Sequence, residues 1–225
     1  MAAVTLGKPA AILKSAQLGY DGKGQVFLEP RDDASSAFVA IGQVPSILEA
    51  RIDFSCEISV IVARTRTGEM VCFTPAENKH KNGILDVSFI PASVKSEIAR
   101  QAENLAKKIA EGLALIGILC VEMFVTKKGE LLVNELAPRP HNSGHWTIDG
   151  CITSQFEQAV RAICGLPLGS VNYFGKTKMQ NLIGDDVSSW QKILNDKHAK
   201  LHLYGKAEAR PGRKMGHVTW VDLKA

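Results

Sequence analysis

The sequence lacks the features that mark several specialised classes of protein. No apolar run reaches the length that a helix needs to span a membrane, and no internal repeat or low-complexity tract is present. Aromatic residues make up only 6% of the chain, and the net charge is only +4. A nucleic-acid-binding surface would need a broader basic stripe with more aromatic side chains. We therefore expect a protein that binds neither a membrane nor a nucleic acid.

Paired cysteine spacing is also missing. The five cysteines are scattered, and four of them lie in apolar runs. This placement indicates reduced thiols in a core, because disulfide-stapled secreted domains space their cysteines as a framework. We therefore expect a cytoplasmic protein, or a plastid protein if a transit segment precedes the chain.

What the chain does contain is an ordinary globular composition with mixed elements. Of its 225 residues, 45% are hydrophobic and 22% are charged, which is enough for one large domain or two small ones. Strands and helices occur without regular alternation, and this predicts an α+β fold. The pattern changes near residue 168, so we predict one domain over residues 1–168 and a smaller, mostly β domain over 169–225.

Hydrophobic periodicity predicts the individual elements. A strand over 8–16 and a second strand after residue 25 form a hairpin, and a short helix with an acidic cap follows. Further strands are expected at 46–52, 56–65 and 69–77. A long helix over 92–115 begins at a Ser93 cap, and a hairpin then turns at Gly129. The apolar stripe of that helix consists of Val94, Ile98, Leu105, Ile109 and Leu113.

The first hairpin contains a candidate phosphate site. Lys14 ends its first strand, and a glycine-rich segment follows. Glycine backbone can close around phosphate oxygens because no Cβ blocks the approach, and a lysine adds positive charge. The segment is neither a Walker loop nor a G-x-G-x-x-G motif, and on its own it is more often a simple turn. Its residues are Gly19, Tyr20, Asp21, Gly22, Lys23, Gly24 and Gln25.

Two glutamates on the second hairpin form a candidate metal site. Glu122 and Glu135 lie seven and six residues from Gly129, so they can face each other across the two strands. Facing carboxylates repel each other unless a cation lies between them. With the amide oxygen of Asn134 they form a set of hard oxygen ligands that suits Mg²⁺. The alternative is two solvated glutamates, but Glu122 lies in an apolar run where a lone charge is costly.

A dense polar segment follows directly after Glu135. Arg139 can hold an oxyanion through two parallel hydrogen bonds, and His141, Asn142 and Ser143 add further polar groups. An irregular loop with one core histidine is the simpler interpretation. So many polar groups directly after a metal carboxylate favour an anion site instead.

Other candidates carry weaker signals. Glu49 could meet a base edge, Glu57 could accept hydrogen bonds from a ribose, and His80 is ambiguous, since each could simply face solvent. The basic residues of the tail could hold a phosphate ester or form a solvated edge. They are Lys206, Arg210, Arg213 and Lys214.

The order of these motifs resembles that of the ATP-grasp enzymes, in which two α+β lobes clamp ATP and Mg²⁺ and form an acyl phosphate. More narrowly, residues 19–25, 134–147, 154–168 and 208–217 are similar to the 5-(carboxyamino)imidazole ribonucleotide synthases of purine biosynthesis. The similarity runs over residues 8–221. The formate-dependent glycinamide ribonucleotide transformylases share part of the segment after Glu135, but they tend to have an aspartate and no tryptophan where this chain has Asn142 and Trp146.

The resemblance implies a role for each motif. Lys14 and residues 19–25 would grip the phosphates of ATP, and Glu122, Glu135 and Asn134 would hold Mg²⁺. Arg139, His141, Asn142 and Ser143 would position bicarbonate and carboxyphosphate. Around the adenosine, the resemblance implies Glu49, Ala50, Arg51, Ile52, Glu57 and His80. For aminoimidazole ribonucleotide it implies Tyr20, Asp21, Lys23, Lys206 and Arg213, the last two at the phosphate.

The implied activity is an ATP-dependent carboxylation of aminoimidazole ribonucleotide with bicarbonate, and the resemblance is compatible with a homodimer. The alternatives are the formate-dependent transformylase and a non-catalytic nucleotide-binding fragment. Members of the family usually begin with a Rossmann-like domain, whereas this chain starts near the strand of Lys14. We therefore expect a fragment, a natural truncation or the synthetase part of a fused carboxylase.

Overall fold

The computed structural model describes residues 10–17 and 24–223. Two compact units make up the chain. Unit 1 contains the described residues up to Asp53 together with Asn82–Ile84, and unit 2 contains Phe54–Lys81 and the chain from Leu85 onward. None of the helices among the described residues is long and apolar enough to cross a membrane.

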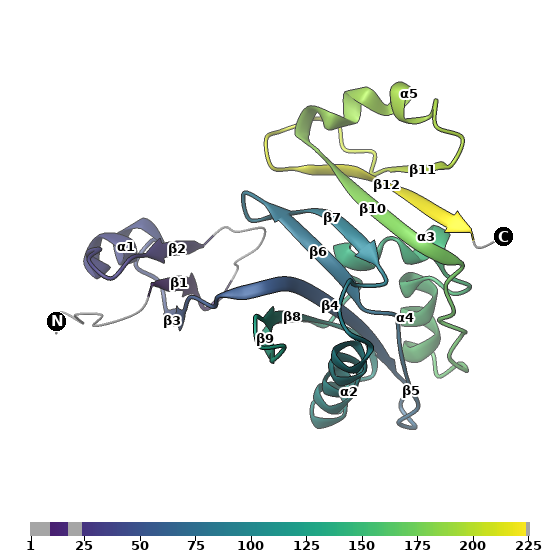
Figure 1. Ribbon diagram of the computed structural model, residues 1–225, viewed down its shortest axis with the longest axis horizontal. Coiled ribbons are helices and arrows are strands. Elements are labelled where there is room, and N and C mark those ends of the chain that lie inside the picture. The colour runs from purple at the N-terminus through teal and green to yellow at the C-terminus, as the bar shows by residue number, and fades with distance from the viewer. Residues whose placement is uncertain (1–9, 18–23, 224–225) are drawn as a thin grey trace. The chain divides into compact units, whose positions relative to one another are not determined.

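In its described part, unit 1 is a three-stranded antiparallel sheet with one helix, in the strand order β2-β1-β3 (Figure 1). Its elements are β1 (Ala11–Ser15), β2 (Gln25–Leu28), α1 (Ala34–Ala40) and β3 (Ser46–Ala50). The predicted acidic cap is confirmed, because the carboxylate of Asp33 accepts hydrogen bonds from the backbone N–H groups of Ser35 and Ser36. The hairpin of β1 and β2 is also confirmed, but its tip lies outside the described residues.

Unit 2 is built on one large sheet. Its described strands run in the order β11-β12-β10-β7-β6-β4-β8-β9, with β5 paired to β4. The strands are β4 (Phe54–Arg64), β5 (Met70–Cys72), β6 (Ala76–Lys81), β7 (Ile84–Ile90), β8 (Gly117–Thr126), β9 (Leu131–Ala137), β10 (Gly175–Ile183), β11 (Ala199–Leu203) and β12 (Lys214–Leu223). The helices are α2 (Ser96–Gly112), η1 (Asn142–Gly144), α3 (Thr147–Gly150), α4 (Gln155–Ile163), η2 (Gly184–Ser189) and α5 (Trp190–Ile193).

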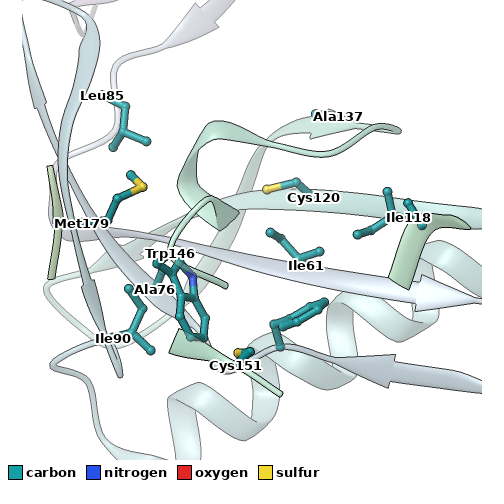
Figure 2. Packing of buried hydrophobic residues seen from close by; sticks show 12 residues of the cluster. Ile61, Ala76, Leu85, Ile90, Ile118, Cys120, Ala137, Trp146, Cys151 and Met179 are labelled. Carbon is teal, nitrogen blue, oxygen red and sulfur yellow. The ribbon is translucent and has the colours of Figure 1, made fainter. Parts of the chain in front are cut away.

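Alternation along β4 and β8 divides the core into two layers, because successive side chains of a strand point to opposite faces. Ile58, Val60 and Val62 pack against the alanines of α2 on one face. Ile61 and Cys120 lie on the other face, in a second cluster with Trp146 (Figure 2). Helix α4 packs on β8 and β4 at this second face (Figure 1).

Some predictions of detail were wrong. Helix α2 begins at Ser96 rather than after Ser93, and its N-cap residue is Lys95, which makes no side-chain capping hydrogen bond. Leu113, placed in the apolar stripe, is 58% exposed. The other four residues of the stripe, Val94, Ile98, Leu105 and Ile109, are partly buried and pack against the cluster that contains Ala102, Ala106 and Ala110.

One strand goes beyond the prediction from sequence, and the sheet continues across the predicted domain boundary. No strand was predicted for residues 84–90, which form β7. The domain boundary near residue 168 stays a prediction. Strand β10, which follows it, pairs with β7, which precedes it, so the sheet continues across this point of the chain.

Candidate functional site

Five ionisable side chains of unit 2 gather on one face of the sheet, and we call them the carboxylate–histidine cluster. Its members are Glu57, His80, Glu122, Glu135 and His141. Strand alternation places them together, because Glu57 and Ser59 of β4 point to the same face as Cys120 and Glu122 of β8. Farther along this face Ile61 and Cys120 enter the core. The same alternation therefore builds core at one end and a polar site at the other.

Glu122 and Glu135 are cross-strand partners, as predicted. The register of β8 and β9 shifts between Glu122 and Met123: Met123 pairs with Val133, whereas Glu122 pairs with Glu135. Asn134 is therefore the extra residue of a β-bulge. A bulge places two residues of one strand opposite one residue of the other, and here it aligns Glu135 with Glu122 although their offsets from Gly129 differ by one residue.

The environment of Glu122 disfavours its charge. Its side chain is 13% exposed, and burial, followed by the negative charge of Glu135, raises the pKa of Glu122 to about 7. One oxygen of each glutamate and one ring nitrogen of His141 lie within 4.8 Å of one another. A cation would favour both charged carboxylates, and oxygen donors suit Mg²⁺. The donor set therefore fits the predicted metal.

The pKa values of the two histidines of the cluster are shifted in opposite directions. Nδ1 of His80 lies 2.6 Å from Oε2 of Glu57. Burial works against the charge of His80, but the hydrogen bond and the charge of Glu57 outweigh burial and raise its pKa. Burial, together with the charges of Arg139 and Lys214, lowers the pKa of His141 to about 4. The 3.5 Å contact between Nε2 of His141 and Oε1 of Glu122 is therefore not an ion pair at neutral pH.

The segment after β9 is held in place by Gln155, the first residue of α4. Its Oε1 accepts from the backbone N–H of His141 (2.9 Å), and its Nε2 donates to the backbone oxygen of His141 (2.7 Å) and contacts Nδ1 of His145 (2.9 Å). The absence of a side chain at Gly144 lets the segment lie close to the sheet, because a Cβ at this position would overlap Cδ1 of Ile61. The segment therefore lies tightly on the sheet.

The residues of this segment that were predicted to bind an anion differ in their exposure to solvent and in their hydrogen-bond partners. Arg139 is exposed, and its Nη1 donates to the backbone oxygen of Pro140 (3.1 Å). The amide of Asn142 exchanges two hydrogen bonds with Asn181, at 2.9 and 2.6 Å. Ser143 is fully buried, with its hydroxyl bonded to His141 and Ser59. A direct contact of Ser143 with a small anion does not fit this geometry, whereas Arg139 is accessible.

In unit 1, part of the predicted nucleotide site can be described. Nζ of Lys14 lies 2.7 Å from Oε2 of Glu49. This ion pair links a residue predicted to bind phosphate with one predicted to lie near adenine. Gln25 pairs with Lys14 in the hairpin, and the N–H of Ser15 donates to the backbone oxygen of Gly24. Ala50 ends β3, and Arg51 and Ile52 follow it, with Arg51 forming an ion pair with Glu29. The predicted residues Gly19, Tyr20, Asp21, Gly22 and Lys23 lie outside the described residues.

In the basic tail, the two residues predicted to bind the substrate phosphate form hydrogen bonds within the tail. Nζ of Lys206 donates to the backbone oxygen of Lys214 (2.6 Å), and Nη1 of Arg213 donates to that of Glu208 (3.1 Å). These two predicted phosphate ligands therefore brace the tail. Lys214 begins β12, and its charge acts on Glu122, His80 and His141. The sequence alone assigns Lys214 only to the basic tail, because its position near the cluster depends on the register of β12 in the sheet.

A second polar group lies beside β12. His217 stacks on His202 (centroids 4.6 Å apart, planes at 13°), and Nε2 of His202 lies 2.8 Å from Oδ2 of Asp149. Asp149, His202 and His217 offer atoms within 4.8 Å of one another, but imidazole lone pairs lie in the ring planes. Those of two stacked rings do not converge on one metal ion, so the arrangement fits a packed stack of histidines.

Sequence reasoning missed the buried polar residues that support the site. Gln155, Asn181, Ser59 and Asn78 are each at most 5% exposed and hydrogen-bonded. Ser59 carried a usable signal, because it is a polar residue within the apolar run of β4. The others become visible only when distant segments are brought together.

Comparisons with known proteins match almost the whole chain. Residues 1–156 match the model of the ATP-grasp domain, and residues 177–225 match that of the phosphoribosylaminoimidazole carboxylase C-terminal domain. The N5-carboxyaminoimidazole ribonucleotide synthase of Brucella melitensis is 52% identical over 92% of this chain and 58% of its own length.

Two solved structures agree with this match. A synthetase of the same name in complex with ADP has a TM-score of 0.91 at 46% identity, covering 96% of this chain and 58% of its own. An Aspergillus clavatus synthase with ADP and 5-aminoimidazole ribonucleotide has a TM-score of 0.88 at 34% identity, covering 97% and 58%. The chain thus spans a little over half the length of these relatives. Because the matching domain model covers more than half of its residues, the chain belongs to the ATP-grasp family.

Proposed function

We propose that this chain provides the ATP-grasp part of an ATP-dependent ligase that carboxylates 5-aminoimidazole ribonucleotide with bicarbonate. The observation that carries the proposal is the Glu122–Glu135 pair, aligned by a bulge at Asn134. The names of the relatives support the same substrates, since one was solved with ADP and 5-aminoimidazole ribonucleotide. A cytoplasmic or plastid location and a homodimer remain predictions.

The proposed reaction has two steps. A bicarbonate oxygen attacks the γ-phosphorus of ATP, the bond from that phosphorus to the bridging oxygen breaks, and ADP leaves. The amine of the ribonucleotide then attacks the carbonyl carbon of the resulting carboxyphosphate, or the carbon of CO₂ released from it; phosphate leaves, and the nitrogen loses a proton. Most of the catalysis in such transfers is positioning and charge stabilisation, so no cysteine needs to act as a nucleophile.

Each group of residues would have a separate role in this reaction. Glu122, Glu135 and Asn134 would hold Mg²⁺, which neutralises charge on the phosphate oxygens. Lys14 would contact the phosphates, and Arg139, the exposed guanidinium after β9, would hold bicarbonate. Glu57 and His80 would face the nucleoside, and Asn142 would meet the anion only by giving up its contacts with Asn181. Lys206 and Arg213 stay predicted contacts of the ribonucleotide phosphate.

The test is phosphate release from MgATP by the full chain, with and without bicarbonate and 5-aminoimidazole ribonucleotide. We expect release to require both, and to be lost in Glu135→Gln but retained in Glu130→Gln, an exposed glutamate on the same hairpin. Stimulation by formate and glycinamide ribonucleotide instead would contradict the proposal. So would equal activity of the two variants.

A further inference from the structure

Buried polar side chains of the described residues form a line of hydrogen bonds that ends on His141. Nδ2 of Asn78 donates to Oγ of Ser59 (2.9 Å), Ser59 donates to Oγ of Ser143 (2.8 Å), and that oxygen lies 2.8 Å from Nδ1 of His141. At the far end, Ser88 donates to Oδ1 of Asn78 (2.8 Å). All five residues are at most 9% exposed. We call them the Asn78–His141 line.

The direction of the line follows from its donors. An amide nitrogen can only donate, so Ser59 accepts from Asn78 and its single proton goes to Ser143. Ser143 therefore directs its own proton to Nδ1 of His141. Its other neighbour is Sγ of Cys120 at 3.8 Å, and sulfur is the weaker acceptor.

A second donor favours the same direction. The backbone N–H of Ser143 donates to Nδ1 of His141 at 3.3 Å. If the amide of Asn78 were turned around, the line would reverse and Nδ1 would have to carry a proton toward Ser143. Two N–H donors would then face each other in a buried site, which is costly. A backbone N–H cannot reverse, so only one direction satisfies every group.

We infer that His141 is held as the neutral tautomer with its proton on Nε2, and that Asn78 is the positioning residue that selects this tautomer through Ser59 and Ser143. A ring nitrogen that accepts hydrogen bonds carries no proton, so the remaining proton lies on Nε2.

The tautomer decides what His141 can do. Nε2 faces Oε1 of Glu122 at 3.5 Å, and an Nε2–H group is a hydrogen-bond donor that cannot ligate a metal through that nitrogen. Although Glu122, Glu135 and His141 lie close enough to share an ion, the metal would be left with oxygen ligands. The N–H would instead be offered to the bicarbonate or the acyl phosphate. This use of the N–H rests on the proposed function, whereas the tautomer does not.

The test is a long-range ¹H–¹⁵N spectrum of the full chain labelled at histidine, recorded at neutral pH without substrates. His141→Gln assigns the signals. We expect Nδ1 of His141 at the shift of an unprotonated ring nitrogen and Nε2 at that of a protonated one. The opposite pattern would overturn the inference. Because no substrate is present, this result is independent of whether the chain carboxylates anything.

Two variants test the role of Asn78. A carboxylate in Asn78→Asp can only accept, so it should reverse the line and produce a signal for protonated Nδ1; Asn78→Ala, which removes the donor, should produce a smaller one. Ser88→Ala leaves the line from Asn78 to His141 intact and should keep the wild-type spectrum. Thermal unfolding confirms that each variant is folded. A wild-type spectrum in the folded Asn78 variants would remove Asn78 as the positioning residue.

Discussion

At the scale of single residues, Glu122 is a proposed metal ligand whose burial is costly to the fold. Its carboxyl is nearly enclosed, it faces Glu135 across the hairpin, and both conditions raise its pKa to about 7. A structural role alone would be served better by an apolar residue, since the neighbours of Glu122 in β8 are apolar. This environment supports the proposal that Glu122 helps to hold a cation.

This cost should appear as a pH-dependent difference in stability. The pKa of Glu122 rises from 4.5 in the unfolded chain to about 7 in the folded one, so the folded state binds the proton more tightly. The stabilisation is complete below pH 4.5 and is lost as the pH rises to about 7. The full effect is at most roughly 3–4 kcal/mol, at about 1.4 kcal/mol per pH unit.

We therefore expect Glu122→Gln to be more stable than the wild type in chelator above pH 7, with the difference disappearing toward pH 4.5. Urea unfolding of both proteins across this range measures the difference, in which the contributions of the other titrating groups largely cancel. Glu130→Gln, at an exposed position, serves as the control and should show no such trend. A difference that does not change with pH would contradict the assigned environment of Glu122.

Gln155 is the residue on which the position of His141 depends. In Gln155→Glu the shape is kept, but the amide donor to the backbone oxygen of His141 and to His145 is lost. Since Gln155 is 0% exposed, we expect a loss of about 2–4 kcal/mol of unfolding free energy. Gln191→Glu, at an exposed position in α5, should change stability little. Equal urea midpoints for the two variants would show that Gln155 does not anchor the segment.

At the scale of elements, the close approach of η1 to the sheet depends on Gly144. A Cβ in Gly144→Ala would overlap Ile61 and the side chain of Gln155, so η1 must move. We expect a cost of about 1–3 kcal/mol and a change in the ¹⁵N shifts of His141. Gly112→Ala, at the end of α2 with open space around it, should be neutral or stabilising by up to about 1 kcal/mol. A Gly144→Ala variant with wild-type stability and shifts would contradict the tight packing.

The elements also show how far the sequence alone leads. The hairpin of β8 and β9, its turn at Gly129 and the facing of Glu122 and Glu135 follow from alternation and counting. The bulge at Asn134, the pairing of β10 with β7 and the placement of Lys214 depend on register between distant strands, which no local pattern encodes. The support of His141 by Asn78 and Gln155 is hidden for the same reason, because its partners come from β6 and α4.

At the scale of the whole molecule, the chain combines the ATP-grasp domain with a second matched region over 177–225, and it spans 58% of the Brucella melitensis relative. Within unit 2 the second region is continuous with the main sheet, because β10 pairs with both β7 and β12. Lys214 of β12 thereby acts on the same cluster as the β8–β9 hairpin. The carboxylate–histidine cluster therefore draws on both matched regions, which is why we propose that this chain takes part in the carboxylation itself.

The most direct test of that claim follows an oxygen atom. If bicarbonate attacks the γ-phosphorus, one of its oxygens must remain on the phosphate that is later released. The full chain is incubated with MgATP, 5-aminoimidazole ribonucleotide and ¹⁸O-bicarbonate, and the isotope shift of inorganic phosphate is read by ³¹P NMR. We expect one labelled oxygen in each phosphate, with no labelled phosphate formed by Glu135→Gln. Release of unlabelled phosphate would mean that water attacks ATP, and it would contradict the proposed carboxylation.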